Sequence, residues 1–170
     1  MRKCWMSRLV AEAGRKGYGM SDFMKKALEE AYEGIRNGHG GPFGSVIVKD
    51  GKVVGRGHNR VLLKHDPTCH GEMEAIRDAC SNLGTHDLSG CELYTTAQPC
   101  PMCLGGILWA NISHVYYGCN INDTDRIGFR DEKFYDNWNN SSDPAFMEEF
   151  EREECLKLFD DYANGDAQRY

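Results

Sequence analysis

The apolar positions of residues 23–37 recur with the period of a helix. They are Met24, Leu28, Ala31 and Ile35. Such a stripe is typical of an amphipathic helix that packs one face against a core. Ser21 and Asp22 supply an N-cap in front of it, and glycines from residue 38 onward end it. The pattern predicts a first helix and an organised domain that starts near residue 20.

Two strand-like segments, 44–49 and 52–56, follow this helix, and Asp50 and Gly51 separate them. Asp-Gly is typical of a two-residue hairpin turn, because glycine adopts a positive φ without strain. We therefore predict an antiparallel β-hairpin.

Helical and strand patterns alternate through the rest of the central region. Residues 70–82 predict a helix that Gly84 ends, 91–97 a strand, 101–110 a helix and 114–120 a strand. A strand, helix, strand unit of this length joins parallel strands, whereas the leading hairpin is antiparallel. The fold class predicted is α/β, with three layers (α/β/α) and a mixed central sheet.

The chain ends in a predicted helical tail, in which Pro144 follows Asp143 as a helix start. Its apolar stripe consists of Cys155, Leu158, Phe159 and Tyr162. We predict three regions: an extension over 1–19 that is disordered or dispensable, one domain over 20–136, and the tail over 137–170.

Composition narrows the class of protein. A chain of 170 residues, 41% of them hydrophobic, fits one globular domain, and no apolar run is long enough to span a membrane. The net charge is −6, although residues 1–19 carry five basic side chains and one acidic. Since the rest is strongly acidic, we expect no nucleic-acid partner. Eight cysteines without a signal peptide favour a reducing cytoplasm.

Two short segments carry side chains of the types and at the spacings that bind metal ions. They are His70-Gly71-Glu72 and Pro99-Cys100-Pro101-Met102-Cys103. Cys100 and Cys103 are three residues apart at a helix start, so their sulfurs share one face near the positive end of the helix dipole. With His70 they predict a Zn²⁺ site between two helix N-termini that has three protein ligands and an open fourth position.

An open zinc site indicates hydrolysis. Zinc lowers the pKa of its water from about 15.7 to roughly 7 in favourable sites. The two motifs together resemble the signature of zinc-dependent base deaminases, which implies that Glu72 is a proton shuttle. It takes the proton from the water, gives it to the ring nitrogen next to the attacked carbon, and later protonates the departing amine. Ammonia leaves and a carbonyl replaces the amino group.

Three other interpretations stay open. A closed structural zinc site would need a fourth ligand such as Cys91, Cys119 or His114. The Cys-x-x-Cys pair could be a redox pair. In a zinc-stabilised interaction module without enzymatic activity, Glu72 would be a surface acid.

The motifs resemble the cytidine deaminase superfamily, in the branch of purine-base deaminases and tRNA adenosine deaminases, over about 20–135. The segments that carry the resemblance are Gly41-Pro42-Phe43-Gly44, His58-Asn59, Asp66-Pro67-Thr68, His70-Gly71-Glu72 and Pro99-Cys100-Pro101-Met102-Cys103. Within that branch the chain most resembles bacterial guanine deaminases, through Gly128-Phe129, Asp131, Phe134-Tyr135 and the C-terminal Tyr170. Arg126 and Arg130 depart from the pattern.

The resemblance implies a role for each site residue. His70, Cys100 and Cys103 bind one zinc ion, and Glu72 shuttles protons. Asn59 bonds the purine, Phe43 and Trp109 wall the base pocket, and Asp131 and Tyr170 close over the base. Each of these substrate-binding residues also has a purely structural interpretation. Phe43 and Trp109 would be core aromatics, Asn59 a turn residue, Asp131 a loop acid and Tyr170 a frayed terminus.

The resemblance also implies a homodimer in which the tail crosses from the partner subunit. The reaction expected is guanine and water to xanthine and ammonia. Guanosine, an aminated triazine, or an adenosine in tRNA remain alternative substrates.

Overall fold

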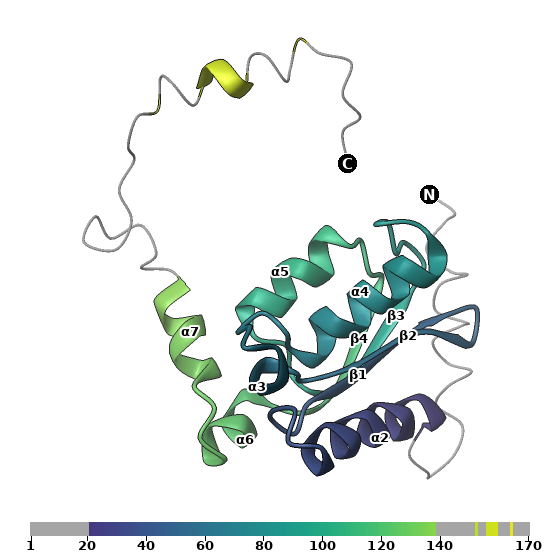
Figure 1. The fold of residues 1–170 in the computed structure, drawn as a ribbon, viewed down its shortest axis with the longest axis vertical. Helices are drawn as coiled ribbons and strands as arrows, with labels where there is room; N and C mark the ends of the chain where they lie inside the picture. The colour runs from purple at the N-terminus through teal and green to yellow at the C-terminus, as the bar shows by residue number, and fades with distance from the viewer. Residues whose placement is uncertain (1–20, 139–151, 153–155, 160–163, 165–170) are drawn as a thin grey trace, which may run out of the picture. The chain divides into compact units, whose positions relative to one another are not determined.

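The computed structural model of the protein describes residues 21–138, 152, 156–159 and 164. Its contacts divide the chain into two units, 1–134 and 135–170. In chain order the elements are α2 (Asp22–Arg36), β1 (Gly44–Lys49), β2 (Lys52–His58), α3 (Val61–Lys64), α4 (Gly71–Leu83), β3 (Glu92–Ala97), α5 (Pro101–Trp109), β4 (His114–Cys119), α6 (Ile121–Arg126) and α7 (Asp131–Trp138) (Figure 1).

The sheet has the strand order β2-β1-β3-β4. β1 is antiparallel to β2 and to β3, whereas β3 and β4 are parallel and are joined through α5. Asp50 and Gly51 have φ values of 50° and 73°, both positive as the tight hairpin turn requires. The predicted mixed sheet and the predicted hairpin are therefore confirmed.

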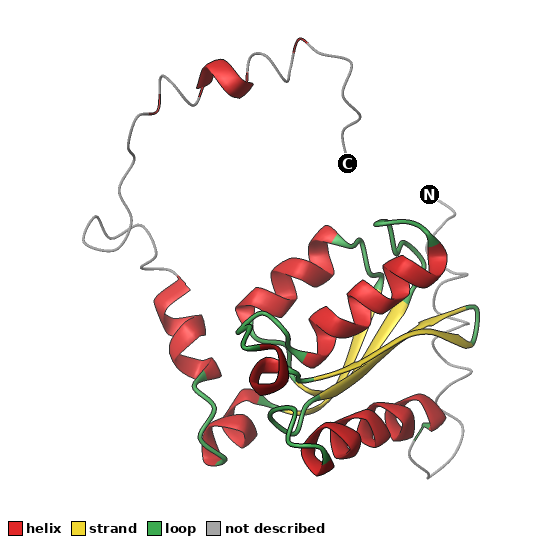
Figure 2. Ribbon diagram, viewed as in Figure 1, coloured by secondary structure: helices red, strands yellow, loops and turns green. Residues whose placement is uncertain are grey.

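Helices cover both faces of the sheet, α4 and α5 on one and α2 on the other (Figure 2). Neighbouring strand residues point to opposite faces. Ile47 accordingly packs with residues of α4 and α5 such as Ala75 and Ile107, while Val46 packs with Ala27 of α2. These two apolar layers confirm the predicted α/β/α architecture.

One glycine brings α4 close to the sheet. Gly57 in β2 faces the backbone of α4, and a Cβ at this position would collide with the amide nitrogen of Ala75. The absence of a side chain lets the first half of α4 lie directly against β2. The residues in that half of α4 are therefore held in a fixed place above the sheet.

The helix starts that carry the metal motif are well defined. His70 is the N-cap of α4 and Cys100 is the N-cap of α5, with Pro101 as the first helical residue. Proline is favoured there, because its missing N–H is not needed in the first turn. At the other end of α4, Gly84 has a φ of 66° and ends the helix in the left-handed conformation, as predicted.

Three short helices and the tail complete the comparison with the sequence. α3, α6 and α7 were not predicted. Of the tail, residues 152, 156–159 and 164 are helical. The predicted extension over 1–19, the helix start at Pro144 and the terminal Tyr170 lie outside the described residues. Among the described residues, no helix combines the length and the apolar character that a membrane span needs.

Candidate active site

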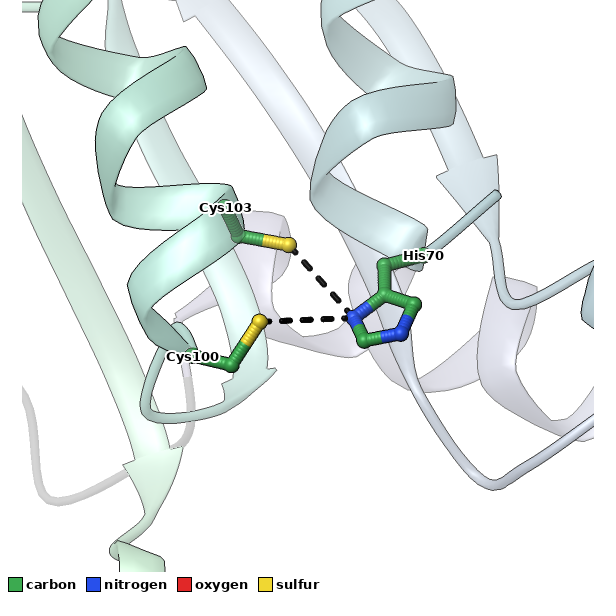
Figure 3. A group of neighbouring side chains, drawn as sticks. All are labelled: His70, Cys100 and Cys103. Carbon is green, nitrogen blue, oxygen red and sulfur yellow. Dashed lines mark hydrogen bonds between the residues drawn. The ribbon is translucent and has the colours of Figure 1, made fainter. Parts of the chain in front are cut away.

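The fold brings the three predicted zinc ligands together. The ligand atoms of His70, Cys100 and Cys103 all lie within 4.8 Å of one another, and each sulfur is 3.6 Å from Nδ1 of His70 (Figure 3). Two of these residues are helix N-caps, and Cys103 lies in the first turn of α5. One imidazole nitrogen and two thiol sulfurs are donors that suit zinc and do not suit magnesium or calcium.

None of the candidates for a fourth protein ligand belongs to this group. Cys91 is buried in the apolar core beside Leu93, and neither His114 nor Cys119 shares the cluster. Three protein ligands leave one tetrahedral position for water or substrate, as in a catalytic zinc site. The geometry thus favours the open site over a closed structural site.

Interactions within the cluster shift the pKa values of its three side chains. A hydrogen bond from the Cys103 thiol lowers the pKa of Cys100 to about 4, and His70 contributes in the same direction. The same neighbour, Cys100, raises the pKa of Cys103 and of His70. One thiolate is therefore already available at neutral pH, and zinc would displace the remaining proton from Cys103.

Glu72 lies beside the ligands in the first turn of α4 and is 5% exposed. Its Oε2 accepts a hydrogen bond from Sγ of Cys103 at 3.5 Å. Burial raises the pKa of Glu72, and the charge of Cys100 adds to the rise. A carboxyl group with a raised pKa next to an open zinc position is suited to both accept and donate a proton near neutral pH.

A pair of buried hydroxyl groups supports Glu72 from the sheet. Oγ1 of Thr95 donates to Oε1 of Glu72 at 3.4 Å, and Oγ of Ser45 donates to Oγ1 of Thr95 at 3.0 Å. The two strand residues are paired in the register of β1 and β3. Sequence reasoning missed both, although a polar residue in an otherwise apolar, buried strand is a signal that it has a partner.

Asn59 follows β2 and is 3% exposed. Its backbone N–H donates to the carbonyl of Phe43 at 2.8 Å, and its Oδ1 accepts from the N–H of Val61 at 3.2 Å. Gly40 packs so closely that a Cβ there would collide with the Asn59 amide. These contacts fix the orientation of the Asn59 side chain before any ligand binds.

A chain of polar side chains lies directly behind Asn59. Nδ1 of His39 is 2.8 Å from Nε2 of His58, and Nδ1 of His58 is 3.1 Å from Oε2 of Glu30. His58 is buried and hydrogen-bonded at both ring nitrogens, so it anchors the end of β2 to α2.

Phe43 and Asp131, the predicted base-pocket residues, have different surroundings. The ring of Phe43 packs edge-on against Phe129, with ring centroids 4.7 Å apart. Asp131 begins α7, and burial raises its pKa, with Cys100 adding to the rise and Thr124 opposing it through a hydrogen bond. The charge of His70 acts in the opposite direction and lowers the pKa of Asp131.

The structure does not bring Trp109 to the cluster within one chain. Trp109 is the last residue of α5 and is 73% exposed. At 1.5 Å per residue it lies about 9 Å along the helix axis from Cys103. Of the arginines that depart from the pattern, Arg126 pairs with Asp123 and Arg130 lies over the ring of Phe134.

Comparison with known proteins gives a consistent result. Residues 19–119 match the family model of the cytidine and deoxycytidylate deaminase zinc-binding region. The chain is 49% identical to guanine deaminase from Bacillus subtilis over 113 residues, which is 66% of this chain and 72% of that protein. It is 42% identical to a tRNA-specific adenosine deaminase from Aquifex aeolicus over 99 residues, 58% of this chain and 65% of that one.

Solved structures agree with these relatives. The structure of guanine deaminase from Bacillus subtilis superposes with a TM-score of 0.82 at 39% identity, covering 89% of this chain and 99% of that one. Guanine deaminase from Nitrosomonas europaea gives a TM-score of 0.62 at 28% identity over 72% of each chain. Because the family model covers more than half of the chain and the zinc ligands lie together, the chain belongs to the cytidine and deoxycytidylate deaminase family of zinc-dependent hydrolases that cleave C–N bonds.

Proposed function

We propose that the protein is a guanine deaminase, which converts guanine and water into xanthine and ammonia. The observation that carries this proposal is the extent of the structural match to guanine deaminase from Bacillus subtilis, 89% of the chain. A match of that extent continues past residue 119, where the family model ends. The structural match to a tRNA deaminase covers only 58% of the chain.

The residues of the cluster have separate tasks in this reaction. Zinc held by His70, Cys100 and Cys103 would supply a nucleophile from water at neutral pH. Glu72 would accept one proton of that water at its carboxylate and pass it to the ring nitrogen beside C2 of guanine. It would then take the proton of the hydroxyl added at C2 and give it to the departing amine, which leaves as ammonia. Thr95 holds Oε1 of Glu72 and so keeps Oε2 directed toward the metal side.

Recognition of the base follows from the groups around the cluster. The amino group and the ring N–H of guanine are donors that the carboxylate of Asp131 would accept, and the amide of Asn59 would bond the polar edge. Phe43, held by Phe129, would cover one face of the ring. The fixed orientation of Asn59 favours one base over others, since an incorrect edge would leave its amide unpaired.

The remaining pocket residues require a second subunit. Trp109 lies away from the cluster along α5, and Tyr170 lies outside the described residues. We infer a homodimer in which the tail of one subunit closes the pocket of the other and in which Trp109 faces the base from across the interface. A cytoplasmic setting is inferred from the zinc ligands, which must be reduced thiols; Cys100 and Cys103 form no disulfide.

Activity on tRNA is the second candidate, because a tRNA-specific adenosine deaminase is among the relatives. The acidic charge of the chain disfavours a polynucleotide, which would need basic contacts to its phosphates. Guanosine and aminated triazines share the polar edge of guanine and stay as small-molecule alternatives.

Ammonia release from purified, zinc-loaded protein tests the substrate directly. The panel contains guanine, guanosine, adenine, cytosine, cytidine, aminated triazines and a tRNA substrate. We expect guanine to give the highest kcat/KM. Inosine formation in tRNA that weakens steeply with salt, without turnover of guanine, would replace the proposal by the tRNA activity.

A further inference from the structure

A second polar site lies beside the N-terminal half of α4 and includes none of the zinc ligands. A pocket of about 360 Å³ is formed between the edge strand β2 and the α3–α4 region. Its charged lining includes Arg56, Arg60, Lys64, Arg77, Glu74 and Asp78. None of these residues is a predicted zinc ligand or a residue of the base pocket.

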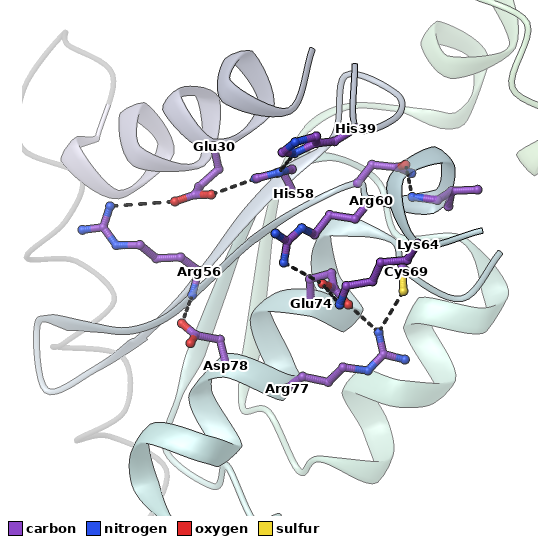
Figure 4. Close-up of polar contacts among 12 residues, drawn as sticks. Glu30, His39, Arg56, His58, Arg60, Lys64, Cys69, Glu74, Arg77 and Asp78 are labelled. Atoms are coloured by element: carbon purple, nitrogen blue, oxygen red, sulfur yellow. Dashed lines mark hydrogen bonds and ion pairs between the residues drawn. The ribbon is translucent and has the colours of Figure 1, made fainter. Parts of the chain in front are cut away.

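Three cationic side chains in this pocket converge on one carboxylate (Figure 4). Glu74 is 7% exposed and accepts from Nζ of Lys64 at 2.8 Å and from Nη1 of Arg77 at 2.6 Å, with Nη1 of Arg60 at 3.6 Å. One negative charge cannot neutralise three positive ones. Two positive charges therefore remain uncompensated around Glu74.

Two further acids, Glu30 and Asp78, line the same pocket. Glu30 faces Arg56 at 4.0 Å and His58 at 3.1 Å, and Asp78 accepts the backbone N–H of Arg56 at 2.8 Å. A backbone N–H does not neutralise the Asp78 carboxylate, so the four cationic and three acidic side chains of the pocket leave a surplus of one positive charge. Such a local excess of positive charge contrasts with a chain whose net charge is −6.

Arg60 adds a hydrogen-bond donor that has no acceptor. Its Nε is buried, and among the described residues it is the buried side-chain nitrogen or oxygen without a hydrogen-bond partner. Buried donors in folded proteins are nearly always paired, with protein, with water or with a ligand. A guanidinium group also presents its donors in a fork that matches the oxygens of a tetrahedral oxyanion.

We propose that this pocket binds a phosphate group, either as inorganic phosphate or as a phosphate monoester. A phosphate group carries the negative charge that this positive surplus favours, and its oxygens offer the acceptor that Nε of Arg60 lacks. Lys64 and Arg77 keep 42% and 45% of their side chains exposed, so they have donors free to turn toward an incoming ligand.

Binding is measured on the full-length, zinc-loaded protein by calorimetry and by thermal unfolding. The probes are inorganic phosphate and ribose 5-phosphate, which carries no base for the deaminase pocket. Ionic strength is held constant with sodium chloride, because exposed charges are screened by salt. We expect saturable heats and a rise in Tm with phosphate that chloride does not produce. Tighter binding of ribose 5-phosphate identifies a monoester as the ligand; equal binding identifies the free anion.

Three variants locate the site. Arg60→Gln and Lys64→Gln should each weaken phosphate binding about tenfold or more, because each removes a charged donor. Lys64→Gln leaves Glu74 with both arginine partners, so its fold is retained even if Arg60→Gln is unstable. Lys52→Gln removes the same charge from an exposed position of the hairpin and should bind as the wild type does.

Two results would overturn the proposal. Absence of saturable binding of both probes means that a water molecule satisfies Arg60 and that the cluster only ties α3 to α4. Equal binding by wild type and Lys64→Gln places the phosphate elsewhere, for example at the zinc ion. The deaminase activity does not enter either result, so the outcome is independent of the proposed function.

Discussion

Replacing Glu72 by glutamine removes the proton shuttle with the smallest change of shape. The side chain is buried, and its two oxygens contact Thr95 and Cys103. Because burial raises the pKa of Glu72, a neutral amide costs less to bury here than a carboxylate does. We therefore expect Glu72→Gln to fold with a Tm near that of the wild type.

The loss of activity follows from the number of proton transfers. General acid and general base steps contribute about 10² to 10⁴ each, and they are not additive when one residue serves both. A fall in kcat of about 10⁴ corresponds to about 5.4 kcal/mol of lost transition-state stabilisation. Because Glu72 is not part of the ligand group, about one zinc ion per chain should remain bound.

The assay combines metal analysis, thermal unfolding and single-turnover conversion of guanine to xanthine. Glu33→Gln, an exposed position on α2, is the matched control and should keep wild-type turnover. If Glu72→Gln retained turnover within tenfold of the wild type while holding zinc, the assignment of Glu72 as proton shuttle would be wrong.

Three further perturbations have distinct signatures. Thr95→Val removes the hydroxyl that donates to the catalytic carboxylate; kcat should fall about tenfold while zinc content and KM stay unchanged, and a change in KM alone would contradict the positioning role. Asp131→Asn should raise KM for guanine about tenfold or more at constant zinc content, and unchanged kinetics would remove it from the base pocket. Burial opposes ionisation of Glu74, but hydrogen bonds from Lys64 and Arg77 outweigh it and lower its pKa. Its contribution to stability is therefore present above the unfolded pKa of about 4.3 and is lost as pH falls through the lower folded pKa. Denaturant unfolding should show Glu74→Gln less stable than wild type at pH 7, and a difference that persists undiminished at pH 2 would refute the ion-pair assignment.

Local signals in the sequence were sufficient for most of the fold. The hairpin follows from Asp50-Gly51, and the end of α4 follows from Gly84. α3 has only four residues, too few for a periodic pattern, and it is held by contacts to distant loops such as the carbonyl of His39. α6 did carry a signal, the capping box of Asn120 and Asp123, which the sequence interpretation did not use.

The site was predictable where its residues share one element. Cys100 and Cys103 are one helical turn apart, and His70 and Glu72 are two residues apart. Ser45 and Thr95 become neighbours only through the register of β1 and β3, which no local spacing encodes. The exposure of Trp109 is likewise a result of packing.

The contacts around His58 and around Glu74 could not be predicted from local spacing either. His58 meets Glu30 across 28 residues of chain and His39 across 19. Lys64 reaches Glu74 through the turn after α3, which ends at His65 with a φ of 51°. Only a few per cent of residues other than glycine adopt a positive φ, so the direction of the chain after α3 was not predictable.

The His70, Cys100 and Cys103 cluster is proposed to bind the zinc ion on which guanine deamination depends. A titration of metal-free protein with zinc, while xanthine formation from guanine is followed, tests this dependence. We expect no turnover without metal and a rate that rises linearly and saturates at about one zinc per chain. Xanthine formation that is independent of zinc, or absence of xanthine from fully zinc-loaded protein, would contradict it.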